Sequence, residues 1–205
     1  RQPQRRYLEL VLEQHPGGLP AVHVDDGARP EVGGALYKAM EFTGEAIEAL
    51  SMDGRFTMCN MAIEAGGKSG IVGFDEKTTQ YLQGRPDGSR ARTAGQVFAS
   101  DREAEYAQVI EIDAGAVRPT VARPHLPSNT AAADTLADVT IDQVVVGSCT
   151  NGRLADLQQA AEILKGRQVH PDVRLIILPG SQEVFLAASR DGTMRGASRT
   201  AATAI

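Results

Sequence analysis

A short apolar segment that ends in a glycine-containing turn and leads into a helical pattern places the strongest constraint on the fold. The segment spans residues 144–146, the turn reads Gly147-Ser148-Cys149-Thr150-Asn151, and the helical pattern covers residues 154–164. The leucines and the alanine at 154, 157, 161 and 164 share one face of that helix. The stretch therefore predicts strand, tight turn and helix, the unit from which parallel α/β sheets are built.

Cys149, in the turn, has two interpretations. Backbone N–H groups at the start of a helix favour negative charge, so a thiolate in this turn can bind a metal or attack an electrophile. The alternative is a small buried residue at a tight turn, because one cysteine without a partner nearby is a weak metal signal. The spacing alone leaves both interpretations open.

A second strand and helix follow the first pair. Residues 173–178 are apolar, a Pro179-Gly180-Ser181 turn comes next, and a helix is predicted from residue 182 to about 188. This βαβα order indicates a parallel sheet, so both turns should lie at the same sheet edge, where open α/β sheets bind ligands. Residues 190–205 show no obvious element.

Two helices are predicted near the middle of the chain, over residues 41–50 and 52–65, with Ser51 as N-cap of the second. Helical spacing puts Cys59 on the apolar face of the second helix, with the other members Met52, Phe56 and Ile63. Asn60 and Glu64 fall on a neighbouring stripe, one turn apart. They either line a shared polar pocket or form part of a solvated face.

The remaining segments carry weaker signals. A short helix is predicted over residues 7–13, strands over 71–74 and 108–113, and a helix capped by Asp75 between the two strands. Prolines make residues 117–129 an extended connector that presents His125 either as an exposed residue or as a ligand or base. His15 and His23 are read as surface or turn residues.

Composition excludes several classes of protein. The chain has 205 residues, 42% of them hydrophobic, and a formal net charge of −5, which argues against nucleic-acid or anionic-membrane partners. The N-terminal residues resemble no secretory signal, and no apolar run approaches the ~20 residues of a membrane span. The two cysteines, Cys59 and Cys149, are read as thiols of a cytoplasmic protein.

Two segments together resemble a known family. Ser51 to Gly66, which contains Cys59-Asn60-Met61 and Glu64, resembles the Cys-Asn-Met…Glu-x-Gly helix of the aconitase superfamily, and the turn around Cys149 resembles that family's Gly-Ser-Cys-Thr-Asn cluster loop. Residues 74–82, 122–129, 165–167 and 179–181 are similar as well. The similarity covers about residues 35–190 and is greatest to the branch of 3-isopropylmalate dehydratase and homoaconitase large subunits.

The resemblance implies a hydro-lyase that removes and re-adds water on a hydroxy di- or tricarboxylate in amino-acid (leucine) biosynthesis. It implies a 4Fe–4S cluster, with Cys149 as one iron ligand, and a small-subunit partner. Asn60 and Glu64 match positions near the cluster and its bound water or substrate, whereas Cys59 has no ligand role. The family's other two cluster cysteines form a Cys-x-x-Cys pair, and no cysteine follows Cys149 here, so the chain alone is expected to be inactive.

The implied fold is an aconitase-like set of three-layer α/β/α units with parallel sheets, incomplete relative to the family. The expected organisation is an unmatched N-terminal segment, an α/β region with the Asn60–Glu64 helix, a linker, a βαβα unit with the cluster loop, and an unmatched tail, at residues 1–34, 35–129, 130–140, 141–190 and 191–205. Two alternatives remain: a non-catalytic remnant or interaction module of the same fold, and an α/β enzyme with Cys149 as nucleophile.

Overall fold

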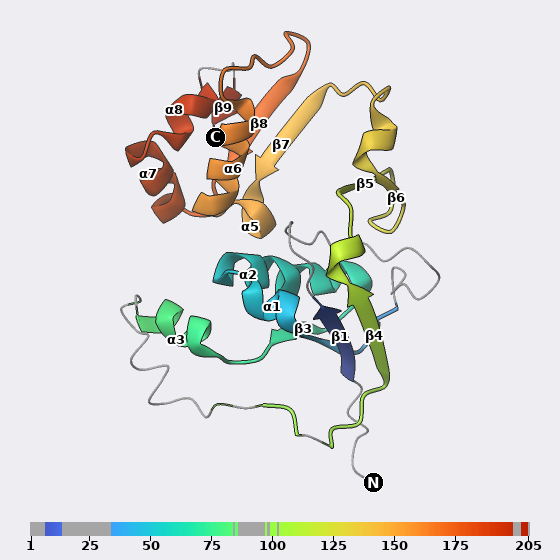
Figure 1. Cartoon of the computed structure of the whole chain (residues 1–205). Helices are drawn as coiled ribbons and strands as arrows, with labels where there is room; N and C mark the ends of the chain where they lie inside the picture. The colour runs from blue at the N-terminus through green and yellow to red at the C-terminus, as the bar shows by residue number, and fades with distance from the viewer. Residues whose placement is uncertain are drawn as a thin grey trace. The chain divides into compact units, whose positions relative to one another are not determined.

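The computed structural model describes residues 7–13, 34–83, 85, 97, 99–101, 103–198 and 202–204, with the backbone alone for 7–13, 196–198 and 202–204. The chain divides into two compact units, Arg1–Ala137 and Asp138–Ile205 (Figure 1). Each unit has its own parallel sheet and its own helices, so the α/β class expected from the sequence is confirmed. His15 and His23 lie outside the described residues. Within the described part of the chain, no helix is both long and apolar enough to cross a membrane.

The first unit is built on a four-stranded parallel sheet in the order β3-β2-β1-β4. Its strands are β1 (Tyr7–Glu13), β2 (Ala39–Thr43), β3 (Ser69–Val72) and β4 (Gln108–Asp113). The predicted helix over residues 7–13 is therefore wrong. The segment Tyr-Leu-Glu-Leu-Val-Leu-Glu places leucine at every second position, which is the strand period, and β1 pairs on both sides with strands far along the chain.

The helix predicted over residues 41–50 is shorter than expected. Residues 39–43 form β2, with Met40 and Phe42 buried, and α1 (Glu45–Ala49) begins only after Gly44, whose φ is 95°. Pairing with β1 and β3 draws this segment into the sheet, and short-range spacing along the sequence does not contain that pairing.

The predicted second helix is confirmed in extent, but its buried face is not the predicted one. Helix α2 (Met52–Met61) is capped by Ser51, whose hydroxyl accepts a hydrogen bond from the N–H of Gly54, and a 3₁₀ turn η1 (Ala62–Ala65) continues it. The buried residues are Arg55, Met58 and Ala62, whereas Ile63 is 70% exposed. The face is rotated because Arg55 turns inward to an ion pair.

The core of the first unit lies between the sheet and α1 and α2, which contact β1, β2 and β3. Cys59 is half-buried and packs against this core, and burial raises the pKa of its thiol. The buried members are Ala35, Met40, Phe42, Ala46, Ile47, Leu50, Met58, Ala62, Ile110 and Ile112. In β4, Ile110 and Ile112 are buried and their neighbours exposed, which confirms the predicted strand with one wet face.

Asp75 precedes α3 (Glu76–Gln83) and caps it, as predicted, by accepting a hydrogen bond from the N–H of Thr78 at 2.9 Å. The strand predicted over residues 71–74 begins and ends two residues earlier, as β3. The 3₁₀ turn η2 (Ala114–Ala116) follows β4.

The predicted connector over residues 117–129 and the first part of the predicted linker form a β-hairpin. Strands β5 (Thr120–Ala122) and β6 (Thr130–Ala132) pair antiparallel, and the 3₁₀ turn η3 (Ala133–Leu136) follows. The hairpin holds residues 123–129 as a closed loop.

The second unit has a three-stranded parallel sheet in the order β7-β8-β9, and the predicted βαβα pattern is confirmed. Its elements are β7 (Gln143–Gly147), α5 (Ser148–Asn151), α6 (Leu154–Leu164), β8 (Arg174–Leu178), α7 (Gln182–Arg190), α8 (Thr193–Ser198) and β9 (Ala202–Ala204). The tail predicted to lack structure contains α8 and β9. These elements form because α8 packs on α6 and α7 and β9 pairs with β8.

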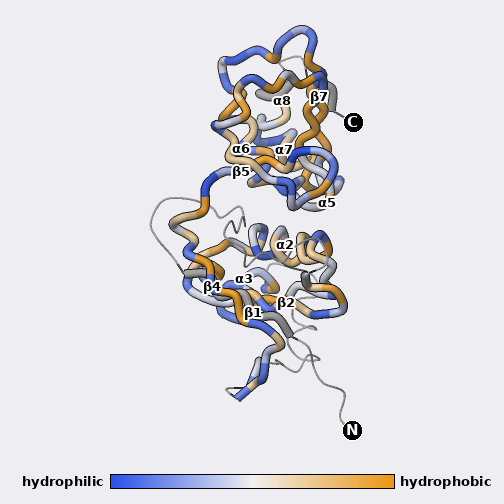
Figure 2. The backbone as a smooth tube through the Cα atoms, turned by 90° about the vertical axis from the view of Figure 1, so that its right-hand side faces the viewer, coloured by the Kyte–Doolittle hydropathy of each residue, from blue (hydrophilic) through white to orange (hydrophobic). Residues whose placement is uncertain are grey.

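The core of the second unit consists of Leu157, Leu175, Ile177 and Ala188, with Leu154 and Leu164 packed against it. The predicted apolar face of the helix at 154–164 is thus the face that packs. Figure 2 shows how hydrophobic residues follow β7, and Val144 and Val146 of this strand pack on the same core.

Candidate functional site

The turn that carries Cys149 depends on Gly147, on Ser148 with its positive φ, and on Gly152. Gly147 has a φ of 111° and Ser148 a φ of 73°, the left-handed region that L side chains rarely adopt. A Cβ on Gly147 would lie 2.1 Å from the carbonyl oxygen of Leu178. The chain can turn sharply after β7 because Gly147 has no side chain.

The turns after β7 and β8 pack directly on one another. The N–H of Gly180 donates to the carbonyl of Gly152 at 2.7 Å, and a Cβ on Gly152 would lie 2.3 Å from the carbonyl oxygen of Ser148. The prediction that both turns lie at the same edge of the sheet is confirmed. Backbone-to-backbone contact of this kind holds the Cys149 loop against the second strand.

Cys149 lies in α5, a separate helical turn, rather than at the start of the long helix. Helix α6 begins at Leu154, with Arg153 as its N-cap: the N–H of Arg153 donates to the carboxylate of Asp156 at 3.0 Å, and its Nη1 donates to the carbonyl of Thr150 at 2.6 Å. Cys149 is exposed, and its Sγ lies 3.9 Å from the hydroxyl of Thr150. The exposure of Cys149 therefore follows from the geometry of this turn, because the residue does not lie at the N-terminus of α6.

Asn60 and Glu64 lie at the end of α2 and in η1, both with exposed side chains. Glu64 lines a hollow whose other lining residues are mostly apolar, and Asn60 is not among them, so a polar pocket shared by the two residues stays a prediction.

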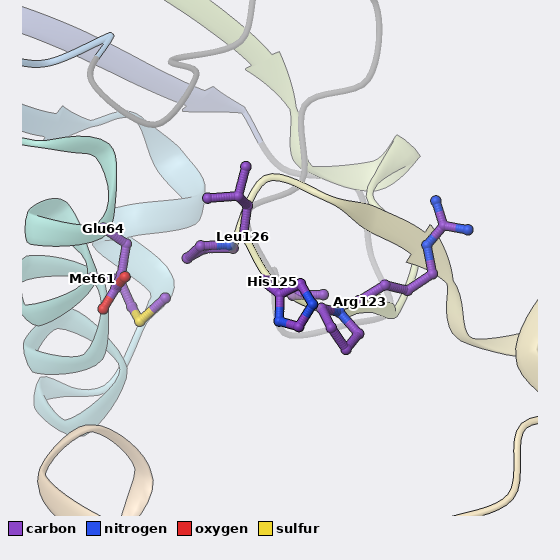
Figure 3. A pocket seen from close by; sticks show the side chains of 8 residues that line it. Met61, Glu64, Arg123, His125 and Leu126 are labelled. Atoms are coloured by element: carbon purple, nitrogen blue, oxygen red, sulfur yellow. The ribbon is translucent and has the colours of Figure 1, made fainter.

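The pocket that Glu64 lines has a volume of about 540 Å³ and lies entirely in the first unit. Figure 3 shows Met61 and Glu64 on one side and His125 and Leu126 on the other, whereas the guanidinium of Arg123 points away from Glu64. The full lining is Met61, Glu64, Ala122, Arg123, Pro124, His125, Leu126 and Pro127. His125 is exposed, as expected for a residue between prolines, and it is also a pocket residue.

Sequence reasoning did not identify Met61, Arg123 or Leu126 as pocket residues. Met61 and Leu126 are ordinary apolar residues, and the contact between the two segments depends on the β5–β6 hairpin, which spacing along the chain does not reveal. The signal available in the sequence is the pair of prolines around His125 and Leu126, each of which fixes its own φ and so restricts the loop.

The predicted site residues fall into different units: Asn60 and Glu64 in the first, Cys149 in the second. Among the described residues, no group of three His, Cys, Asp or Glu side chains is placed to hold a metal ion. A cubane cluster in this family's pattern needs three thiolates, and the sequence has two cysteines, one of them packed against the first unit's core. The residues present therefore do not fit a complete iron–sulfur site.

Comparison with known proteins establishes the ancestry of the chain. The sequence profile of the Aconitase family (aconitate hydratase) matches residues 28–137 and 126–200. The chain belongs to the aconitase family. It is 56% identical over 161 residues to the 3-isopropylmalate dehydratase large subunit of Moorella thermoacetica, a match that covers 78% of this chain and 37% of the relative.

Other relatives of this aconitase-family chain have the same description. The 3-isopropylmalate dehydratase large subunits of Clostridium botulinum and Acetivibrio thermocellus are 51% and 53% identical, over 164 and 161 residues. The matches cover 80% and 78% of this chain. The chain spans less than two-fifths of the length of these relatives, at 38% and 37%.

Proposed function

We propose that this chain is a segment of a hydro-lyase of the 3-isopropylmalate dehydratase type, which removes water from a branched hydroxydicarboxylate and adds it back at the neighbouring carbon. The observation that carries the proposal is the identity of 51–56% over four-fifths of the chain to large subunits of that enzyme. We further propose a cytoplasmic enzyme with a small-subunit partner, since the relatives are named as large subunits and both cysteines of this chain are free thiols.

In this proposal Glu64 and Asn60 act on the substrate and Cys149 binds iron. The carboxylate of Glu64 accepts a hydrogen bond from the substrate hydroxyl or from water, and the carboxamide of Asn60, one turn away, donates to a substrate oxygen. Both side chains are exposed at the surface of the first unit, so a ligand can reach them. Cys149 is exposed on a turn of fixed backbone geometry, which suits a thiolate ligand supplied to a shared centre.

A 4Fe–4S cluster supplies a Lewis-acidic iron to enzymes of this kind. These 205 residues supply one candidate thiolate, Cys149, so we propose that the chain by itself neither assembles such a cluster nor catalyses dehydration. Iron and sulfide added anaerobically to the purified chain should then leave no stable visible charge-transfer absorption. A stable absorption of that kind would contradict this part of the proposal.

A chimeric large subunit tests the catalytic part. This chain replaces the aligned segment in the large subunit of the Moorella thermoacetica relative, and the chimera is reconstituted with that enzyme's small subunit. Dehydratase activity is expected, with Cys149→Ser removing both iron and activity and Cys59→Ser, the matched control, retaining iron. A folded chimera that binds iron without activity, or a Cys149→Ser variant with full iron content, would refute the assignment.

A non-catalytic module of the same fold is the second candidate, and the incomplete ligand set favours it. In that case the chimera folds and stays inactive with native iron content. The third interpretation, Cys149 as a nucleophile, needs a base beside the thiol, and the group that the structure places next to Sγ is the hydroxyl of Thr150, which is not a base at neutral pH.

A further inference from the structure

Helix α2 has two candidate buried faces. One is the apolar stripe that helical spacing predicts, Met52, Phe56, Cys59 and Ile63. The other is the face that the structure buries, Arg55, Met58 and Ala62. At about 100° per residue, the centres of the two faces lie about 100° apart around the helix axis. The helix is therefore turned away from the orientation that its apolar side chains favour.

The contacts of Arg55 explain the observed orientation. The residue is 2% exposed, and its Nη2 donates to the carboxylate of Asp75 at 2.6 Å and to the carbonyl of Glu48 at 3.1 Å. These contacts tie α2 to the last turn of α1 and to the residue that caps α3 (Figure 1). A buried guanidinium needs its counter-charge, so the side of α2 that carries Arg55 has to face inward.

The neighbouring strand β3 does not oppose a rotation of α2 where the two come closest. Gly70 makes this contact, and a Cβ added there would lie 2.6 Å from the Cα of Cys59 and 3.1 Å from the Cβ of Ala62. The helix rests on bare strand backbone at this point. Here β3 has no side chain that would select one rotation of the helix, whereas the ion pair of Arg55 does.

The observed rotation directs the side chains of Asn60 and Glu64 outward, and both are exposed. At about 100° per residue, Asn60 lies about 170° from the centre of the buried face. If the apolar stripe were buried instead, Asn60 would lie about 70° from the centre of that face, at the flank of the core. The direction of this side chain thus depends on which face of α2 is buried.

We propose that Arg55 is a positioning residue: its ion pair with Asp75 sets the rotation of α2 about its axis and so directs Asn60 and Glu64 away from the core. The role of Asn60 and Glu64 toward a substrate rests on the proposed function, whereas the rotation does not. Without the ion pair, α2 should turn toward its apolar stripe, because burial of Ile63, now 70% exposed, removes apolar surface from water.

The two native thiols report this rotation in the full 205-residue chain. Cys59 belongs to the apolar stripe and is half-buried, and Cys149 is exposed in the second unit. Both are alkylated with N-ethylmaleimide under native conditions, and the rate at each cysteine is measured by mass spectrometry of its peptide. A rotation toward the stripe buries Cys59 more deeply and slows its reaction, whereas general loosening of the unit speeds it. Cys149 is the internal reference.

Arg55→Met and Asp75→Asn should each slow the alkylation of Cys59 about fivefold and leave the rate of Cys149 unchanged. The first variant removes a positive charge and the second a negative one, so a purely electrostatic effect on the thiol would have opposite signs in the two. Lys77→Met is the matched control. It removes a positive charge and the donors to the carbonyls of residues 48–50 but no contact of Arg55, so it should leave Cys59 unchanged.

A thiol introduced by Ile63→Cys is the second probe, since its position is exposed now and would lie at the centre of the buried stripe after rotation. Arg55→Met should slow its alkylation as well. This probe and Arg55→Met decide the question if Asp75→Asn does not fold. Unchanged or faster alkylation of Cys59 and of the introduced thiol in Arg55→Met would overturn the proposal, as would opposite changes of Cys59 in the two variants.

The chimeric large subunit tests whether the rotation matters for activity. Arg55→Met should lower kcat about tenfold without loss of iron, because the side chains of the proposed pair are misdirected, and Lys77→Met should retain kcat. An inactive chimera together with slowed alkylation would reject the dehydratase assignment and keep the role of Arg55 in the rotation. An active chimera with unchanged alkylation would do the reverse. Slowed alkylation with an unchanged kcat would refute the positioning of Asn60 and Glu64.

Discussion

Replacing Asp75 by asparagine should destabilise the first unit more than removing the arginine that Asp75 binds. Nη2 of Arg55 donates to the carboxylate of Asp75 at 2.6 Å and to the carbonyl of Glu48 at 3.1 Å. The side chain of Arg55 is 3% exposed and that of Asp75 36%, so the two charges are buried to very different degrees. This difference in burial determines which substitution lowers the free energy of unfolding more.

The magnitude follows from what each substitution leaves behind. Asp75→Asn leaves a buried guanidinium without its counter-charge, a change that costs about 3–5 kcal/mol for fully buried pairs. Because Asp75 is a third exposed and asparagine still accepts a hydrogen bond, we expect about 2–3 kcal/mol here. Arg55→Met removes the buried charge and two donors, Nε and Nη1, that have no partner among the described residues, and it leaves Asp75 hydrated and bonded to Thr78. We expect about 1 kcal/mol for it.

Tyrosine fluorescence reports this unit alone. The chain has no tryptophan, and its four tyrosines, at positions 7, 37, 81 and 106, all belong to the first unit. Urea unfolding at pH 7 followed by this signal gives the free energy of unfolding for each variant. Asp134→Asn is the matched control, since its ion pair with Arg118 is exposed on both sides and should cost less than about 0.5 kcal/mol. If Arg55→Met costs as much as Asp75→Asn or more, the reasoning from burial is wrong.

Three further predictions follow from single contacts. The hydrogen bond from Arg55 holds the pKa of Asp75 well below its ordinary value. The stability that the ionised carboxylate contributes is therefore complete above about pH 4 and is lost as the pH falls further. Between pH 5 and pH 3 the urea midpoint should drop less in Asp75→Asn than in the wild type. Gly152→Ala should destabilise the second unit by about 2 kcal/mol or more, measured by thermal unfolding followed by circular dichroism. The control Gly166→Ala should cost about 1 kcal/mol, because the added Cβ meets open space and only the φ of 71° is unfavourable. Equal costs for the two variants would contradict the close packing of the two turns. Ser51→Ala should cost about 1 kcal/mol by the tyrosine-monitored urea assay, and Ser69→Ala is the control expected to change little.

The local signals of the sequence identified the elements whose period and caps are complete within the segment itself. The strand, turn and helix around Cys149, the N-cap at Ser51, the helix after Asp75 and the alternating strand at 108–113 all appear in the structure. In each case the residues that specify the element lie within it, so no distant partner is needed to read them. The family resemblance includes the segments around Cys149, Ser51 and Asp75, and the match to the aconitase family confirms it.

The predictions are wrong for elements that depend on distant partners. Residues 7–13 and 39–43 become strands because they pair with each other and with β3 and β4, and the hairpin at 120–132 forms from a stretch that reads as a connector. The inner face of α2 is set by Arg55, which turns inward because the carboxylate of Asp75, 20 residues later, lies there to receive it. Periodicity along one segment contains none of these pairings.

The turn around Cys149 shows the same difference between what the local sequence predicts and what distant contacts determine. By itself the sequence determined that a strand, a glycine turn and a helix stand in a row with the cysteine in the turn. Only the tertiary structure decided that Cys149 belongs to a separate helical turn, held by backbone contact between Gly152 and Gly180. The reason is physical: spacing along a chain records which side chains share a face, whereas the close approach of two backbones depends on how distant strands pair.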